Sequence, residues 1–243
     1  LVMVSGMLSG IFVVCANAFM NTPAGFTLHP DGSLATVDVW AAMWNPAAFS
    51  QTLHMTLASF VAIGFLVAGI HGRRLLQGSP TAFDRSAFRI ALGTGAVFAC
   101  LMPLSGHLSA QHVARHQPVK FAAMEAHFHT ARGVPAVIGG IADEEAAETR
   151  WALHIPKAMS LLAFDDPDAE IRGLTSFDRD LWPPVNVVHI AFQIMIACSM
   201  AMLSVGLYAF FLAWRRRQAP LWYLRVCVLA ATLGFIAIQA GWN

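Results

Sequence analysis

Two side chains in apolar stretches of the sequence carry atoms that can bind iron. His54 lies in the run Thr52–Met55, inside a segment without a single Asp, Glu, Lys or Arg. An ionisable group is costly in such a segment and usually has a functional role. Met195 lies in a later apolar segment. An imidazole and a thioether together form a known axial pair for low-spin haem iron, with both coordination sites filled for electron transfer.

A structural role is the alternative for each of the two residues. His54 can hydrogen-bond a neighbouring helix instead of a metal. Met195 can fill space in an apolar core, which is what most methionines on such helices do. Spacing along the sequence does not show that the two side chains meet, so both interpretations stay open.

A lysine and a carboxylate form a second candidate pair. Lys120 and Glu125 are five residues apart on a short helix predicted to follow Pro118, about one and a half turns from each other. Surface Lys and Glu are usually only solvated. Oxidation of a hydroquinone, however, releases two protons, and a carboxylate can accept one of them. The pair is therefore a candidate site for a quinol.

The composition indicates the elements that must position these residues. Of the 243 residues, 57% are hydrophobic and 12% are charged, and the mean hydropathy is +0.58. Soluble domains carry about 25% charged residues. We therefore predict an all-α, polytopic membrane helical bundle, because lipid leaves no partner for open backbone groups. The predicted spans are Val2–Met20, Gln51–His71, Ala87–Leu104, Val187–Trp214 and Leu221–Gly241.

Arginine placement predicts the orientation of the bundle. The two short connections and their flanks hold eight arginines and only one acid, Asp84, whereas the other loops hold the remaining acids. Basic short loops face the cytoplasm. The loops 21–50 and 105–186 should then face outward, the periplasm of a bacterial cell with an inner membrane, and His54 and Met195 should stand at similar depth. The run Arg215–Arg217 is interpreted as a topology signal, not as a nucleic-acid site.

We expect three parts along the chain. They are 1–104 with three transmembrane helices, the outer loop 105–186, and 187–243 with two transmembrane helices. The sequence begins and ends in apolar stretches, so a piece of a longer polytopic chain is expected. His71 and His189 lie at span ends, where their polar tips should reach the interface.

Several segments, in this order, resemble subunit I of the cytochrome bd-type quinol oxidases. Asn17–Gly25 is similar to the family's Asn-x-x-Met-x-x-Pro-x-Gly motif. Gln117–Phe128 is similar to the start of its quinol-binding Q-loop, which here is residues 105–186. Phe192–Met195 is similar to Phe-Arg-Ile-Met. The second half of the Q-loop and the approach to the last motif are matched by Ile155–Lys157, Glu170–Leu174 and Ala240–Trp242. The short Q-loop resembles that of the members called cyanide-insensitive.

The resemblance implies a role for six residues. His54 and Met195 would be the axial ligands of a low-spin haem b, and Lys120 and Glu125 would belong to the quinol site. Gln193 stands where the family commonly has Arg, and is expected to alter a contact to a haem propionate or the haem potential. Trp242 is a candidate for a residue that lies between haem groups.

The resemblance also implies an enzyme of aerobic respiration. Electrons would pass from ubiquinol or menaquinol through the low-spin haem to a high-spin haem b and a haem d, where oxygen is reduced to water. The partners would be subunit II of the oxidase and membrane lipid. The family's residues for the high-spin pair are absent from this sequence. We therefore expect the chain to hold the low-spin haem and part of the quinol site, without reducing oxygen by itself.

Two other classes of membrane protein are alternatives. Another haem b membrane cytochrome, such as a bc-type quinol reductant, would need two histidine pairs stacked along two spans, and one convincing intramembrane histidine is present. A cofactor-free transporter or structural subunit would favour Gly- or Pro-broken spans in repeated halves. No such repeat is evident.

Overall fold

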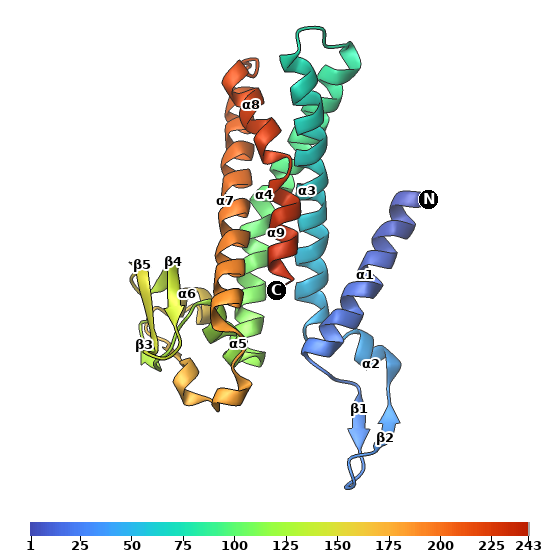
Figure 1. Ribbon diagram of the computed structural model, residues 1–243. Coiled ribbons are helices and arrows are strands. Elements are labelled where there is room, and N and C mark those ends of the chain that lie inside the picture. The colour runs from blue at the N-terminus through green and yellow to red at the C-terminus, as the bar shows by residue number, and fades with distance from the viewer. Residues whose placement is uncertain (243) are drawn as a thin grey trace. The chain divides into compact units, whose positions relative to one another are not determined.

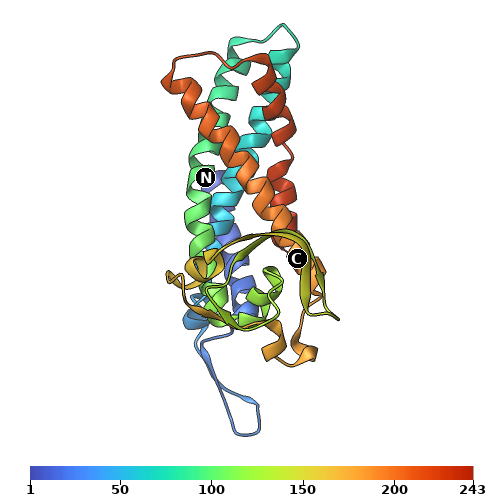
Figure 2. The ribbon, with the colours of Figure 1, turned by 90° about the vertical axis from the view of Figure 1, so that its left-hand side faces the viewer.

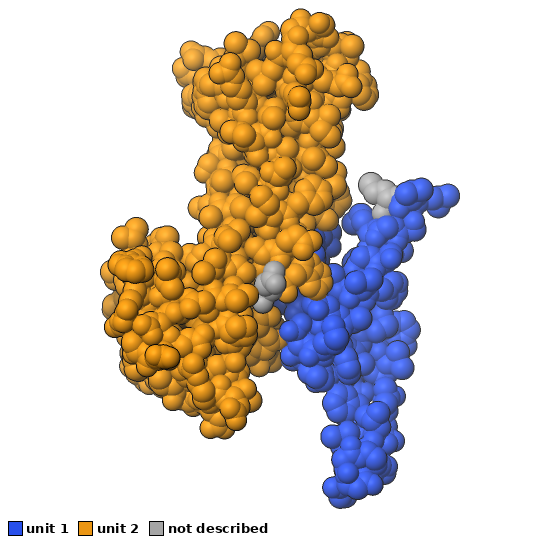
Figure 3. Space-filling view, in the orientation of Figure 1, with its two compact units in different colours: residues 1–57 blue, residues 58–243 orange. Residues whose placement is uncertain are grey.

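The computed structural model describes residues 1–242, and two compact units divide the chain. They are Leu1–Leu57 and Ala58–Asn243, coloured separately in Figure 3. The boundary falls within a single long helix, α3 (Ala48–Leu76). His54 therefore belongs to the first unit and Met195 to the second.

The first unit consists of a long helix followed by a hairpin. Its elements before α3 are α1 (Val2–Asn21), β1 (Phe26–Leu28), β2 (Leu34–Val37) and α2 (Val39–Met43). The strands β1 and β2 pair antiparallel. A small core of Cys15, Ala18, Ala47 and Ala48 joins α1 to the start of α3. Asn17 on α1 also donates a hydrogen bond to the Gln51 side chain at 3.2 Å.

The second unit contains a bundle of helices (Figure 1). With the rest of α3 it contains α4 (Ala82–His116), α7 (Val185–Trp214), α8 (Leu221–Ala230) and α9 (Leu233–Gly241). In the described residues of both units, five segments are long and apolar enough to cross a membrane. They lie on α1, α3, α4, α7 and the combined stretch of α8 and α9. The prediction of an all-α bundle with about five spans is confirmed.

Small residues let the helices of this bundle approach closely. A Cβ on Gly64 of α3 would come within 2.7 Å of Gly95 on α4, and a Cβ on Gly234 of α9 within 2.5 Å of Ala62. Close backbone approach at small residues is how membrane helices associate, since lipid removes the hydrophobic drive between them.

Two predicted helix ends differ from the structure. The helix α4 passes through Pro103 and continues to His116, so the expected end at Leu104 is wrong and the expected boundary at 104/105 falls inside a helix. A helix satisfies its own backbone hydrogen bonds, so it need not end where the apolar part of the sequence ends. The last predicted span is interrupted at Ala231 and Thr232, between α8 and α9.

The Q-loop folds beyond α4 at one end of the second unit, and both short connections lie at the other end (Figures 1 and 2). Its elements are α5 (Pro118–Met124), β3 (Ala131–Arg132), β4 (Ala136–Asp143), β5 (Glu148–Ile155), α6 (Ala158–Phe164) and β6 (Glu170–Ile171). The pairs β4–β5 and β3–β6 are antiparallel. Single 3-10 turns at Leu174–Ser176 and Arg179–Leu181 lead into α7.

Candidate functional site

The helix α5 places the two residues of the candidate quinol site. Pro118 occupies its first turn, where a missing N–H costs nothing. Phe121 is buried against α4 and α6, whereas Ala122 and Ala123 are buried in a cluster that includes α7. Lys120 is left exposed, and Glu125 follows the last residue of the helix, partly buried. The predicted short helix after Pro118 is confirmed.

Desolvation by nearby protein atoms changes the acid–base behaviour of both side chains. Desolvation raises the pKa of the Glu125 carboxyl to about 7, although a hydrogen bond from the Val137 backbone lowers it in part. Protein atoms around the Lys120 amine lower its pKa by the same desolvation. Glu125 therefore changes charge near neutral pH, as a carboxylate that takes up and releases protons must.

His189 on α7 joins the two segments that surround Glu125. Its ring is fully buried, with Nδ1 2.8 Å from the carbonyl oxygen of Met124 and Nε2 3.0 Å from that of Gly139. Met124 directly precedes Glu125, and Gly139 lies on β4 two residues after Val137. The expectation that the polar tip of His189 reaches the membrane interface is wrong, because the backbone of the Q-loop covers it.

Two more polar side chains of α7 bind the same strand. Gln193 donates to the Val137 carbonyl at 2.9 Å and accepts from the Gly139 amide at 3.2 Å. Asn186 donates to the Ala142 carbonyl at 2.6 Å and accepts from the same residue's amide at 2.8 Å. We call Asn186, His189 and Gln193 the polar stripe of α7.

Sequence reasoning missed the role of Asn186 and His189. The signal was their spacing: with Gln193 they lie at i, i+3 and i+7, which is one helix face. Three such groups on a membrane helix need partners, and β4 provides backbone groups for all of them.

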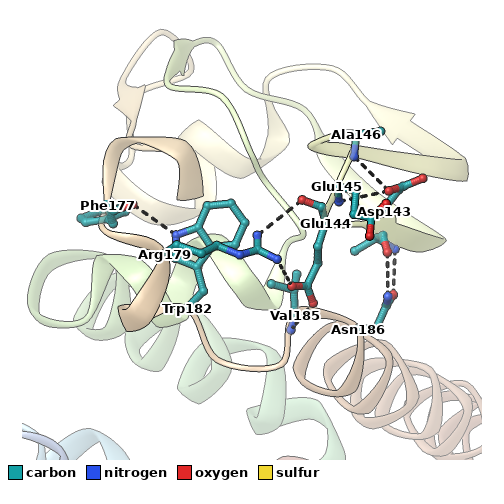
Figure 4. A network of polar contacts seen from close by, with 10 residues as sticks. Asp143, Glu144, Glu145, Ala146, Phe177, Arg179, Trp182, Val185 and Asn186 are labelled. Atoms are coloured by element: carbon teal, nitrogen blue, oxygen red, sulfur yellow. Dashed lines mark hydrogen bonds and ion pairs between the residues drawn. The ribbon is translucent and has the colours of Figure 1, made fainter.

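The start of α7 is fixed by a second network of polar contacts (Figure 4). The Glu144 carboxylate accepts from the Val185 amide at 3.1 Å and from the Arg179 guanidinium at 2.7 Å. The Arg179 guanidinium also lies 4.1 Å from the centre of the Trp182 ring. Because α7 has no side-chain cap from its own preceding residue, Pro184, Glu144 satisfies one open N–H and complements the positive helix end.

The two candidate iron ligands lie on membrane helices. His54 is half-buried on α3, and Met195 is partly buried on α7, where it packs against the core of the second unit. A Cβ on Gly241 would stand 3.0 Å from the Met195 sulfur, so the glycine leaves the thioether its space. Trp242, next to it, is 49% exposed. The pairing of His54 with Met195, and the positions of Gln193 and Trp242 near a haem, stay predictions.

The whole sequence agrees with one protein family. The family model described as cytochrome bd terminal oxidase subunit I matches residues 1–243. The chain belongs to the cytochrome bd terminal oxidase subunit I family.

Curated and solved members of this family are similar over nearly the whole chain. A putative cytochrome bd menaquinol oxidase subunit I of Bacillus subtilis is 34% identical over 99% of the chain and 55% of the relative. A cytochrome bd ubiquinol oxidase subunit 1 of the same organism is 27% identical, over 97% of the chain and 53% of the relative. The chain thus spans about half the length of these curated relatives.

A solved member of the family has the same fold. The bd oxidase structure from Geobacillus thermodenitrificans matches with a TM-score of 0.89 and 33% identity, over 98% of this chain and 55% of that one. Together with the five apolar segments, this makes the cytochrome bd family chain a multi-pass membrane protein.

Proposed function

We propose that this chain is the quinol-oxidising part of a terminal quinol:oxygen oxidoreductase. In this proposal the Q-loop oxidises quinol, and electrons pass to a low-spin haem b within the membrane. The single observation that carries the proposal is the setting of Glu125, a carboxylate with a pKa of about 7 held by α5, β4 and α7. Membership of the cytochrome bd family supports the reaction class.

Oxidation of a hydroquinone to a quinone releases two protons and two electrons. Deprotonated Glu125 accepts one of these protons from a quinol hydroxyl, and a pKa close to the working pH serves both uptake and release. Lys120 is exposed on α5, five residues before Glu125. As an ammonium it can donate a hydrogen bond to an oxygen of the quinol ring. In this proposal α5 and the residue that follows it provide a hydrogen-bond donor and a proton acceptor for the same substrate.

His54 and Met195 would hold the low-spin haem b. Imidazole and thioether fit this group by donor chemistry, and Gly241 leaves open the space beside the Met195 sulfur that a Cβ would fill. When bound, such a haem accepts and passes on single electrons. Gln193 is two residues before Met195, so a residue that binds β4 and a proposed iron ligand share the same two turns of α7.

The remaining parts of the oxidase are proposed from membership of the family. The acceptors of the electrons would be a high-spin haem b and a haem d, with oxygen reduced to water there, and subunit II would be the protein partner. The substrate would be menaquinol or ubiquinol, since the names of the Bacillus subtilis relatives include both. The Q-loop would face the periplasm of a bacterial inner membrane, because the arginine-rich connections lie at the opposite end of the second unit.

The proposal is tested with the complete oxidase in bacterial membranes. We expect Glu125→Gln to lower quinol oxidation by about two to four orders of magnitude, which is what loss of a general base costs. The visible spectrum of the haems after reduction by dithionite should be the same in Glu125→Gln as in the wild type. The matched control is Glu145→Gln, an exposed carboxylate of the same loop, which should keep wild-type rates. Equal rates for Glu125→Gln and Glu145→Gln would refute the proposed role of Glu125.

A further inference from the structure

Both ring nitrogens of His189 face acceptors. Nδ1 lies 2.8 Å from the Met124 carbonyl oxygen and Nε2 lies 3.0 Å from the Gly139 carbonyl oxygen. A carbonyl oxygen has no proton to donate, and a neutral imidazole has only one N–H. In the neutral form one nitrogen lone pair would therefore point at a carbonyl lone pair. Only the doubly protonated ring can form both hydrogen bonds.

We infer that His189 is a buried imidazolium that positions the quinol-site carboxylate by clamping α5 to β4. The part that concerns quinol rests on the proposed function, whereas the charge state of His189 does not. The clamp acts through the backbone on both sides of Glu125: one hydrogen bond ends on the residue before it, and the other ends on the strand whose Val137 contacts its carboxylate. His189 is thus a positioning residue and does not itself need to touch the substrate.

A buried cation requires compensation, which the two hydrogen bonds of His189 and the carboxylate of Glu144 supply against the opposing dipole of α7. An isolated charge away from water is very costly, but charge-assisted hydrogen bonds are about twice as strong as neutral ones. His189 is 0% exposed and makes two of them. The start of α7 opposes a cation through the helix dipole. Glu144, which binds the first amide of that helix, carries a charge of the opposite sign.

The elements packed against α7 also carry titratable groups, which bear on the charge of His189. On the α5 segment they are Lys120 and Glu125, and at the end of β4 there is Asp143. Those on α4 in the half that reaches the Q-loop are His107, His112, Arg115 and His116, and those on α8 are Tyr223, Arg225 and Cys227. Among the carboxylates of this set, Glu125 follows directly the residue that His189 binds.

The charge state is measured on the wild-type protein, and a variant serves only to assign the resonances. The complete oxidase is labelled with 15N-histidine, and the ring resonances of His189 are assigned by their loss in His189→Gln. We expect two protonated ring nitrogens at pH 7. An unprotonated nitrogen on His189 at that pH would overturn the inference. The ring resonances of His29, an exposed histidine, are assigned in the same way through His29→Gln and serve as the reference for a histidine outside the clamp.

The positioning role is tested with two amides that each keep one donor. An Asn amide nitrogen can reach the position of Nδ1, and a Gln amide nitrogen the position of Nε2, so each variant keeps one of the two hydrogen bonds and lacks the positive charge. For both His189→Asn and His189→Gln we expect the KM for quinol to rise by about tenfold with a smaller change in kcat. The dithionite-reduced haem spectrum should be unchanged, and His29→Gln should match the wild type.

A wild-type KM in both His189 variants would overturn the clamp. Failure of the proposed function would look different: Glu125→Gln would then oxidise quinol as fast as the wild type, while the 15N resonances would still report the charge of His189. The two ideas can therefore fail separately.

Discussion

At the scale of single residues, Glu125 owes its properties to backbone that is distant in sequence. Its carboxyl is desolvated by the Q-loop and contacts the Val137 backbone. The next residue, Ala126, accepts a hydrogen bond from the Thr149 hydroxyl at 2.8 Å. None of these contacts is local, so the spacing of Lys120 and Glu125 could predict a candidate pair but not which of its members titrates near neutral pH.

The raised pKa of Glu125 predicts the pH dependence of quinol oxidation. The base must be deprotonated, so kcat/KM for quinol should rise with pH through about 7 and level off above it. The same shift affects stability: the ordinary pKa of a glutamate side chain is 4.5, so the contribution of protonated Glu125 to folding is complete below pH 4.5 and is lost as the pH rises through about 7. The test is the pH profile of quinol oxidation in the wild type and in Glu125→Gln. The same rise in the variant would assign it to another group.

Gly241 provides a prediction about the thioether of Met195. A Cβ at Gly241 would stand 3.0 Å from the sulfur, closer than ordinary van der Waals contact. The end of a methionine side chain is flexible, so Gly241→Ala should cost little stability. An iron ligand, however, is sensitive to such a displacement, and we expect a shifted low-spin haem band in the reduced spectrum. As a control, Gly93→Ala, where a Cβ would meet nothing within 4 Å, should leave the band in place.

At the scale of elements, α7 determines where the Q-loop lies. The polar stripe binds β4 at Val137, Gly139 and Ala142, so a helix of membrane-spanning length fixes a strand of the Q-loop. The length and apolar character of α7 were predictable from hydropathy. The pairing of its stripe with β4 was not, because hydropathy does not report which backbone groups lie opposite a polar side chain.

The contact of Asn186 with β4 can be measured by hydrogen exchange. In Asn186→Ala the amide and carbonyl of buried Ala142 lose their partner, which should cost about 1–3 kcal/mol. Exchange in peptides that cover 136–155 should accelerate accordingly in the purified oxidase. The control is Ser204→Ala, because Ser204 only bonds a carbonyl of its own helix. If both variants exchange alike, the hairpin does not depend on Asn186.

The differences between the predicted and observed elements have physical causes. The sequence from Ser105 to His116 is too polar to read as membrane, yet it continues α4 as a helix in the Q-loop. The hairpin β4–β5 contains Gly139 and Gly140 at positive φ and a non-glycine residue, Trp151, at φ 56°. The register of this pair is constant, but burial along both strands lacks the regular alternation by which strands are predicted.

At the scale of the whole molecule, the placement of charge predicts how the chain crosses the membrane. The connection at 215–220 follows α7 and holds three arginines, and the hairpin β4–β5 lies at the other end of the same helix. Since basic short loops stay in the cytoplasm, the Q-loop should be outside. Protons released from quinol at Glu125 would then leave on the outer side.

Labelling of added cysteines in intact cells tests this orientation. A membrane-impermeant thiol reagent should modify Glu145→Cys in the Q-loop and should reach Gln218→Cys only after the cells are permeabilised. Both positions are exposed. The parent with its four natural cysteines gives the background. Labelling of Gln218→Cys in intact cells would invert the topology and with it the side on which protons are released.

The most direct test of the account is the reduced-minus-oxidised visible spectrum of the complete oxidase in membranes. It should be recorded for the wild type, His54→Ala and Met195→Leu. We expect the wild type to show a low-spin haem b band and each substitution to abolish it, because an axial pair needs both members. A band that survives unchanged in either variant would contradict the assignment of His54 and Met195 as the ligands.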